Sequence, residues 1–336
     1  MTARVLSSGL LTTVQDLGRP GRQRDGIPVS GAMDHAALRI ANLLVGNGED
    51  GAALEGTLIG PALEFAEPAL VAIAGADFDA TIGEQPVPAW HAVYVPRGAT
   101  LRVGAHGAGC RPYVAIAGGI DVPSVFGSRS TYVRAAFGGL EGRALRAGDV
   151  LHRGAPSDLS CAIQRELSAD ADRVGIARWT IGAPVRPHYS ADPIVRVVEG
   201  AQTHELTDES RARLFGERFR VSASSDRMGY RLEDVKLALK HPIEMLSEGV
   251  AFGTIQLPPG GAPIVLMADR QTTGGYPRIG EVASVDLPLI AQLKPGDRVR
   301  FRLISLADAQ RLYLAREADL TQARAAIALR YSRGRS

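Results

Sequence analysis

The residues best suited to hold a small ligand follow a predicted buried strand in the second half of the chain. An apolar run at 263–268 predicts the strand, and the segment after it reads Asp269-Arg270-Gln271-Thr272-Thr273-Gly274-Gly275-Tyr276. Glutamine and threonine both donate and accept hydrogen bonds, as an amide or ureido group requires, and glycines let backbone N–H groups approach a ligand closely. The same residues suit a turn that closes a barrel, with Asp and Thr bonded to loop backbone, so both interpretations stay open.

Other polar side chains also stand among glycines. Arg227 lies in Ser225-Asp226-Arg227-Met228-Gly229, where a turn would either present it to an anionic group or hold it in a surface ion pair of little consequence. Asp34 and Asn42 lie on one predicted helix, about 80° apart around its axis. The helix dipole favours an acidic residue in the first turn, so a structural role for Asp34 competes with a chemical one. The segment Gln15-Asp16-Leu17-Gly18-Arg19-Pro20 has the composition of a turn.

Motifs for phosphate, metal or serine chemistry are absent from the sequence. The chain has no G-x-x-x-x-G-K-[ST] phosphate cradle, no G-x-G-x-x-G after a strand, no G-x-S-x-G elbow and no H-E-x-x-H pair. The seven histidines are scattered, and Cys110 and Cys161 form no C-x-x-C pair. We therefore expect no metal site, no cofactor bound by a recognisable motif and no Ser-His-Asp machinery.

Composition limits the class of protein. The 336 residues are 45% hydrophobic and 22% charged, with a formal net charge of +2, which is typical of a globular protein with a real core. A charge so close to zero gives no reason to expect nucleic acid or an anionic membrane as a partner, and no run of about 18 apolar residues predicts a membrane span. Two cysteines and the lack of an apolar leader favour the cytoplasm.

Frequent glycine and proline residues between short apolar runs predict that many short strands carry the polar segments. The chain has 38 Gly and 20 Pro, and strands are predicted at 70–74, 92–95, 101–103, 113–117, 194–198, 263–268, 282–285 and 299–304. One device recurs three times, a glycine at a tight turn directly before a strand, at 96–99, 146–149 and 294–297. Such turn-and-strand units are typical of barrels and sandwiches.

Helices are predicted to be few. An apolar stripe predicts one over 32–45, capped by Ser30 and ended by Asn47-Gly48. A short helix is predicted at 209–215, and a long one at 306–329 whose start is marked by Ser305 and Asp308. The polar, proline-containing stretch at 153–187 indicates a boundary. We expect domains at 1–185 and 186–305 and a helical tail at 306–336, whose arginines form a solvated face.

Taken together, seven segments resemble the allophanate hydrolase subunit 2 family, which includes the C-type subunit of 5-oxoprolinase and biotin-dependent carboxyltransferases. They are T-T-V-Q-D-L-G-R-P-G at 12–21, G-I-P-V-S-G-A-M-D at 26–34, A-N-L-L-V-G-N at 41–47, I-A-G-G-I-D-V-P at 116–123, G-S-R-S-T at 127–131, S-D-R-M-G-Y-R at 225–231 and D-R-Q-T-T-G-G-Y-P at 269–277. Their order and their spread over nearly the whole chain make the resemblance specific. The chain departs from it at Gly200-Ala201-Gln202, where the family often has Gly-Pro-Gln, and in its long arginine-rich tail.

The resemblance implies a mainly β fold of two linked cyclophilin-like β-barrel domains with a few helices and a C-terminal helix. It implies part of an enzyme: either the C-type subunit of an ATP-dependent 5-oxoprolinase, a hydrolase that opens a cyclic amide to glutamate, or a carboxyltransferase that moves CO2 from carboxybiotin to urea. Its partners would be a subunit 1 type, kinase-inhibitor-like protein and a third subunit. ATP would act at the level of the complex, and biotin would be used in the carboxyltransferase alternative. No Met-Lys-Met biotin carrier is present, which favours the oxoprolinase type. A third alternative is a non-catalytic regulator of the kinase-inhibitor-like partner.

The same resemblance suggests roles for the polar residues. Asp34, Arg227, Asp269 and Gln271 are the expected catalytic residues, with the two aspartates orienting donors or accepting a proton. The expected substrate-binding residues are Asn42, Arg129, Thr272, Thr273, Gly274, Gly275 and Tyr276. In this scheme Gln271 and the two threonines bind the amide or ureido group, Arg227 and Arg129 hold a carboxylate or phosphate, and Tyr276 forms a wall. No protein nucleophile is needed, because fixed donors meet the charge that develops on the substrate oxygen.

Overall fold

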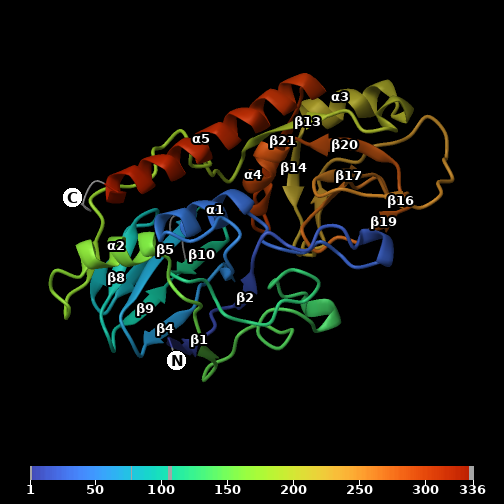
Figure 1. Ribbon diagram of the computed structural model, residues 1–336. Helices are drawn as coiled ribbons and strands as arrows, with labels where there is room; N and C mark the ends of the chain where they lie inside the picture. Colours follow the sequence, from blue (N-terminus) through green and yellow to red (C-terminus); the bar gives the residue numbers. More distant parts are fainter. Residues whose placement is uncertain (1, 77, 105–107, 333–336) are drawn as a thin grey trace. The chain divides into compact units, whose positions relative to one another are not determined.

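The computed structural model describes residues 2–76, 78–104 and 108–332, and the chain groups into two compact units (Figure 1). Unit 1 comprises Met1–Gly18, Asp34–Pro187 and Glu317–Ser336, and unit 2 comprises Arg19–Met33 and His188–Arg316. Each unit is therefore built from segments that are distant in sequence. The division into domains at residues 185 and 305 stays a prediction.

The strands of unit 1 form two six-stranded antiparallel sheets. The first sheet consists, in spatial order, of β11 (Val150–Leu151), β1 (Ala3–Ser7), β4 (Ala62–Phe65), β9 (Thr100–Val103), β6 (Ala80–Ile82) and β7 (Gln85–Pro86). The second consists of β12 (Gly175–Ile176), β8 (Ala92–Val95), β5 (Ala69–Gly75), β10 (Pro112–Ile116), β3 (Ala53–Thr57) and β2 (Leu11–Gln15). Strands β5 and β10 are buried along their whole length. Their unbroken apolar sequence follows from cover on both faces, which includes helix α1 (His35–Leu44) packed on both strands.

Helix α1 begins and ends at other residues than the sequence predicts. Its N-cap is Asp34, whose carboxylate accepts the N–H of Ala37 at 2.9 Å, so the predicted start at residue 32 and the predicted cap, Ser30, are wrong. An Asp cap satisfies an orphan N–H and adds charge at the positive end of the helix dipole. The helix stops before Asn47-Gly48 because Gly46 takes a left-handed φ of 75° just beyond the last turn.

Unit 2 contains a closed seven-stranded barrel, and closure leaves the barrel itself without an open sheet edge. Its strands, in order around the barrel, are β13 (Ile194–Val198), β20 (Arg278–Val282), β17 (Thr254–Gln256), β18 (Ile264–Leu266), β15 (Gly229–Glu233), β14 (Arg218–Val221) and β21 (Arg298–Leu303). The parallel pairing of β13 with β21 closes the ring. Inside, Phe219 and Phe301 lie 5.6 Å apart between ring centroids. A separate two-stranded sheet pairs β16 (Glu248–Gly249) with β19 (Thr273–Gly274).

The glycine-turn device is confirmed at all three places. Gly98, Gly148 and Gly296 have φ values of 76°, 94° and 92°, and strands β9, β11 and β21 each begin two residues later. Each turn is closed by a backbone hydrogen bond from the residue after the glycine to the residue two before it. Positive φ at these positions is the reason glycine is needed. The predicted mainly β fold with barrel architecture and a C-terminal helix is likewise confirmed.

One predicted strand is wrong, and one helix is missed by the sequence. Residues 282–285 do not form a strand, because β20 ends at Val282 and Ser284–Asp286 is a 3-10 helix, η4, followed by α4 (Leu287–Ala291). The carboxylate of Asp286 there accepts the backbone N–H of Arg196 at 2.7 Å, which ties this turn to strand β13 of the barrel. The stretch at 153–187 contains helix α2 (Asp158–Leu167), capped by Ser157. Its apolar content is low because it buries only Ser160 and Ile163.

The remaining helices are α3, three short 3-10 helices and the C-terminal helix α5. Helix α3 is Asp208–Gly216, close to the predicted range, and the short 3-10 helices are η1 (Gln23–Asp25), η2 (Val133–Ala135) and η3 (Thr203–Glu205). The long C-terminal helix α5 (Leu306–Ser332) is capped as predicted, because the hydroxyl of Ser305 accepts the N–H of Asp308 at 3.1 Å. Within the described residues, no helix combines the length and apolar character that a membrane crossing needs.

Candidate functional site

Arg227 and Asp269 form a buried ion pair in unit 2. Arg227 stands just before β15 and Asp269 just after β18, and the pairing of these strands continues beyond their ends through the N–H of Asp269, which donates to the carbonyl of Arg227 at 2.8 Å. Nε of Arg227 donates to Oδ2 of Asp269 at 2.8 Å, and Nη2 donates to Oδ1 at 3.1 Å. The side chains are 10% and 9% exposed. Barrel geometry thus brings together two of the predicted catalytic residues.

The same ion pair fastens a tight turn of the 19–33 segment to the barrel. The hydroxyl of Ser30 donates to Oδ1 of Asp269, and Nη2 of Arg227 donates to the carbonyl of Gly31 at 2.6 Å. Ser30 and Gly31 both have a left-handed backbone, with φ of 56° and 90°. A non-glycine residue in that region is held there by its surroundings, here by a charged partner. The pair therefore positions the turn, while direct catalytic roles for Arg227 and Asp269 stay predictions.

The predicted amide-binding segment, residues 271–276, follows Asp269 closely in the sequence and is largely accessible to solvent. Thr273 and Gly274 form β19, and the carbonyl of Thr272 accepts the N–H of Val250 at 3.2 Å. The side chains of Gln271 and Thr273 are exposed, and Tyr276 is 45% exposed. Gly274 is packed closely, because a Cβ there would lie 2.3 Å from Nε2 of Gln256. The strand pairing thus presents Gln271 and its neighbours to solvent.

Burial perturbs two charged groups beside this segment. Desolvation lowers the pKa of Arg270 to about 10, against the opposing attraction of the Glu281 and Asp269 carboxylates. Desolvation also raises the pKa of Glu281, although the hydroxyl of Thr254 donates to it at 2.8 Å. Arg270 is not among the predicted site residues, although it lies between two of them. Perturbed pKa values cluster at functional sites, which makes Arg270 a further candidate. The sequence does not identify it, because its burial becomes visible only in the folded structure.

Asp34 and Asn42 serve the architecture of unit 1. Asp34 caps α1, and its backbone N–H donates to the hydroxyl of Tyr113 at 2.8 Å. Tyr113 in turn donates to the carboxylate of Glu55 at 2.6 Å. Burial and the two neighbouring carboxylates hold the pKa of Tyr113 well above its ordinary value. Asn42 is buried and donates to the carbonyl of Gly51 at 2.7 Å. Substrate binding by Asn42 and catalysis by Asp34 stay predictions.

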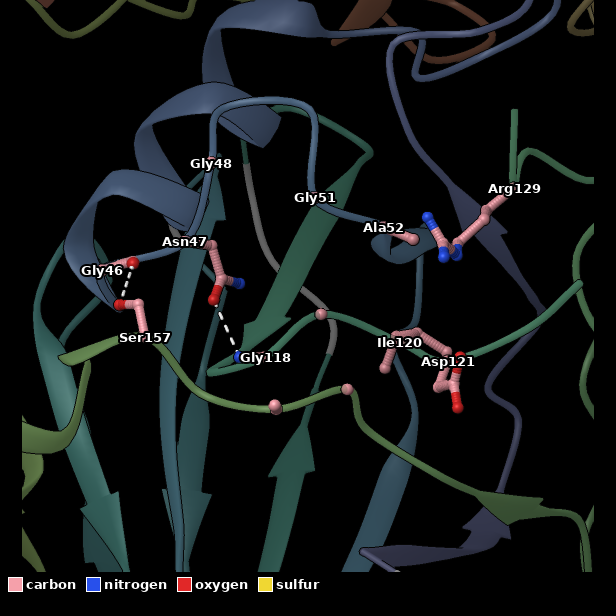
Figure 2. A pocket seen from close by; sticks show the side chains of 13 residues that line it. Gly46, Asn47, Gly48, Gly51, Ala52, Gly118, Ile120, Asp121, Arg129 and Ser157 are labelled. Carbon is pink, nitrogen blue, oxygen red and sulfur yellow. Dashed lines mark hydrogen bonds between the residues drawn. The ribbon is translucent and has the colours of Figure 1, made fainter. Parts of the chain in front are cut away.

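Unit 1 also contains a glycine-lined pocket of about 220 Å³ (Figure 2). We call it the glycine pocket. Its lining residues are Gly46, Asn47, Gly48, Gly51, Ala52, Gly118, Gly119, Ile120, Asp121, Arg129, Gly154, Ala155 and Ser157. Three of the seven segments that carry the family resemblance contribute to it, at 41–47, 116–123 and 127–131. The fourth wall is the 154–157 strip that leads into α2, a contribution that the sequence does not predict.

Close backbone approach explains two of the pocket glycines. A Cβ on Gly118 would lie 2.2 Å from the carbonyl oxygen of Gly154, and a Cβ on Gly154 would lie 2.6 Å from the carbonyl oxygen of Gly118. Gly118 also has a φ of 93°. Real Cβ atoms do not approach so closely, so both positions require glycine for the two strips to pack together. In Figure 2 the amide of Asn47 accepts the N–H of Gly118 at 2.8 Å, which ties the same wall to the end of α1.

Arg129 enters the glycine pocket from a loop that Asp16 holds in place. The Asp16 carboxylate accepts the backbone N–H of Arg129 at 2.6 Å and the hydroxyl of Ser128 at 2.6 Å. It also accepts the hydroxyl of Ser130 and the N–H of Gly18, the latter at 2.8 Å. A carboxylate that accepts this many hydrogen bonds fixes the loop firmly. The loop in turn sets the position of Arg129, the one predicted substrate-binding residue that lines this pocket.

The described residues contain no group of three or more His, Cys, Asp or Glu side chains placed to hold a metal ion. Asn47, Asp121 and Ser157 line the glycine pocket but are not singled out as site residues by the sequence. Asn47 and Asp121 belong to segments that carry the family resemblance. Their place in these segments is the only sign in the sequence that Asn47 and Asp121 belong to a site. The spacing of the segments along the chain does not show that they meet at one pocket.

Comparison with known proteins matches the chain to one family and to relatives with two kinds of activity. The family model described as carboxyltransferase domain, subdomain A and B, matches residues 25–303. The C-type subunit of 5-oxoprolinase from Haemophilus influenzae is 37% identical over 312 residues, which cover 93% of this chain and 94% of the relative. The corresponding 5-oxoprolinase protein of Escherichia coli is 38% identical, with 91% and 92% of the two chains covered.

A solved structure supports the same fold. The crystal structure of the K. lactis urea amidolyase superposes with a TM-score of 0.86 at 31% sequence identity. The match covers 96% of this chain but only 20% of that chain. The likeness therefore extends over both units of the present chain and over one part of a much longer enzyme.

Proposed function

Because this chain belongs to the carboxyltransferase domain family, subdomains A and B, we propose that it is the C-type subunit of an ATP-dependent 5-oxoprolinase complex that opens 5-oxoproline to glutamate. The observation that carries the proposal is the end-to-end similarity to two 5-oxoprolinase proteins of this type, which covers more than nine tenths of every chain involved. The similarity to the urea amidolyase covers a fifth of that enzyme. The family resemblance seen in the sequence motifs is confirmed by these matches.

The proposed reaction breaks the amide bond of a five-membered lactam. Water adds to the lactam carbonyl carbon, and the carbonyl oxygen gains negative charge in that step, which donors fixed in advance stabilise most effectively. The C–N bond then breaks, and the nitrogen takes up a proton and becomes the amine of glutamate. We assign this role to Gln271, Thr272 and Thr273 with the backbone of Gly274 and Gly275. The support is the exposure of Gln271, Thr273 and Gly275 and the pairing of β19, which Thr273 and Gly274 form, with β16. Asp269 and Arg227 orient the start of the segment through their ion pair.

The proposed complex contains a subunit 1 type, kinase-inhibitor-like partner and a third subunit, and ATP is consumed by the assembled complex. Both relatives are named as subunits of 5-oxoprolinase, which supports an assembly of several chains. We place the complex in the cytoplasm, which agrees with the fact that Cys110 and Cys161 are not joined by a disulfide.

Biotin-dependent carboxyl transfer is the second candidate function. It is favoured by the description of the matching family and by the TM-score of 0.86 with the urea amidolyase. In that reaction a ureido or amide group accepts CO2 from carboxybiotin, and the same polar segment would meet the same developing charge. The third alternative, a regulatory subunit without turnover, predicts tight binding of the partner alone.

The deciding experiment measures ATP-dependent glutamate release from 5-oxoproline by the purified complex, with and without this chain. Loss of glutamate release on omission, restored by adding the chain back, would support the oxoprolinase role. Full activity without the chain, or none in any mixture, would contradict it. Transfer of label from carboxybiotin to urea in the same preparation would then support carboxyl transfer, and tight partner binding without either reaction would support regulation.

A further inference from the structure

We infer that the glycine pocket of unit 1 binds a small carboxylic acid that also carries an N–H donor, with Arg129 holding the carboxylate. This inference rests on three observations: the structure of the pocket, the partners of its polar side chains and the two charged residues on its wall. The choice of 5-oxoproline or glutamate as the acid rests on the proposed function. The binding chemistry itself rests only on the residues of unit 1.

Most polar side chains of the pocket are occupied by the fold. The amide of Asn47 donates to the carbonyl of Ile116 and to Asn42, each at 2.9 Å, and accepts the N–H of Gly118. The hydroxyl of Ser157 donates to the carbonyl of Gly46 at 2.7 Å (Figure 2). The donor groups of Asn47 and Ser157 are therefore already used in hydrogen bonds that hold the pocket walls together. What remains for recognition is the pair of charged side chains, Arg129 and Asp121.

Arg129 has the geometry of a carboxylate clamp. Its backbone N–H is held by Asp16, and its Nε donates to the carbonyl of Val122 at 3.1 Å. In the part of the chain that the structure describes, its two terminal nitrogens have no protein acceptor. Figure 2 shows the side chain extending from its loop toward Ala52 on the pocket wall. The guanidinium of this exposed side chain is held at Nε and can offer the edge formed by its two terminal nitrogens to a carboxylate.

Asp121 supplies the second point of recognition. Its backbone N–H is used by the carbonyl of His152 at 2.9 Å, and among the described residues its carboxylate has no donor partner. Arg129 and Asp121 form no ion pair with each other in the described structure, although both line the pocket. A ligand with an anion at one end and an N–H donor at the other would satisfy both. A lactam acid or an amino acid has that pair of groups, and inorganic phosphate does not.

The size of the pocket agrees with a small metabolite. Its volume of about 220 Å³ lies below the roughly 300–1,000 Å³ of pockets that hold drug-sized ligands. The glycines limit it further, since every side chain added at Gly118 or Gly154 would collide with backbone. The glycines therefore leave room for a small ligand, and Arg129 and Asp121 place two opposite charges on the wall of the pocket.

Calorimetric titration of the full chain tests the inference with four probes: 5-oxoproline, glutamate, the neutral lactam 2-pyrrolidinone and inorganic phosphate. We expect 5-oxoproline or glutamate to bind at least about tenfold more tightly than 2-pyrrolidinone, because the neutral lactam has no carboxylate to accept charged hydrogen bonds from Arg129. Arg129→Gln should weaken acid binding at least about tenfold, and Arg129→Lys should weaken it less. Asp121→Asn should weaken binding of the acids but not of phosphate.

The control is Arg102→Gln, which removes the same charge from an exposed residue of the same unit outside the pocket. It should bind the acids like the wild-type chain. Equal acid binding by wild type and Arg129→Gln, tighter binding of phosphate than of either acid, or no acid binding by wild type would each overturn the inference. Glutamate release by the complex distinguishes the two proposals. Acid binding that depends on Arg129, without any glutamate release by the complex, supports the pocket and removes the oxoprolinase role. Glutamate release by the complex, with equal acid binding by wild type and Arg129→Gln, supports the oxoprolinase role and removes the pocket.

Discussion

The carboxylate of Asp16 accepts the backbone N–H of Arg129 at 2.6 Å, although the two residues are 113 positions apart in sequence. Asp16 is 8% exposed, and it gathers three further donors from Ser128, Ser130 and Gly18. The turn at the end of β2 therefore fixes the loop that carries Arg129 into the glycine pocket.

Asp16→Asn is expected to lower the free energy of unfolding by about 1.5–3 kcal/mol, because the amide keeps the shape of the side chain but loses the charge that strengthens these hydrogen bonds. Urea denaturation of the full chain measures the change. Glu84→Gln, an exposed residue of the same unit, is the matched control and should stay within about 0.5 kcal/mol of wild type. An Asp16→Asn chain as stable as the control would show that the loop is held by other contacts.

Arg227→Met is expected to destabilise the chain by about 3–5 kcal/mol, since it leaves Asp269 as an uncompensated buried charge. The double variant Arg227→Met/Asp269→Leu should lose less than the sum of the two single changes, because neither charge is then left alone. Thermal or urea unfolding gives the coupling free energy. Arg218→Met breaks the exposed pair with Asp192 and should cost at most about 1 kcal/mol. Additive losses at Arg227 and Asp269 would refute the coupling.

Acid sensitivity is expected to depend on Asp149. Arg143 donates two hydrogen bonds to this carboxylate, at 2.7 and 3.0 Å, and holds its pKa below the ordinary value. A depressed folded pKa stabilises the fold above the unfolded pKa of about 4, and that contribution is lost as the pH falls through the lower folded pKa. The unfolding free energy of Asp149→Asn should therefore fall less steeply than that of wild type below about pH 4. Parallel pH profiles of the two chains would exclude this contribution, and Glu84→Gln should follow wild type.

Local signals in the sequence predict the turns and the most apolar strands. Gly98, Gly148 and Gly296 have positive φ, and their position directly before a predicted strand identifies them in the sequence. Helix α2 escapes prediction because it buries only two residues, and residues 282–285 resemble a strand because their apolar alternation is also compatible with a 3-10 turn packed on the barrel. The predicted helix cap at Ser30 is wrong because Ser30 is engaged by Asp269 instead.

The candidate sites depend on contacts that spacing does not reveal. The Arg227–Asp269 pair follows from antiparallel pairing of β15 with β18, and two motifs separated by 42 positions meet at its end. The glycine pocket needs four strips of chain, one of which carries no motif. Residue types suggest which segments bind ligands, whereas burial and pairing decide which side chains are committed to the fold.

Gln271→Ala separates activity from stability better than any change at Arg227. The side chain of Gln271 is exposed, so its removal should leave the unfolding free energy within about 0.5 kcal/mol of wild type. If Gln271 donates to the lactam oxygen as that oxygen gains charge, glutamate release by the assembled complex should fall by about tenfold or more, mainly in kcat. Gln85→Ala, exposed on β7, is the matched control and should retain wild-type turnover. Wild-type kcat and KM in a well-folded Gln271→Ala complex would remove Gln271 from the reaction and move the donor role to the threonines and glycines that follow it.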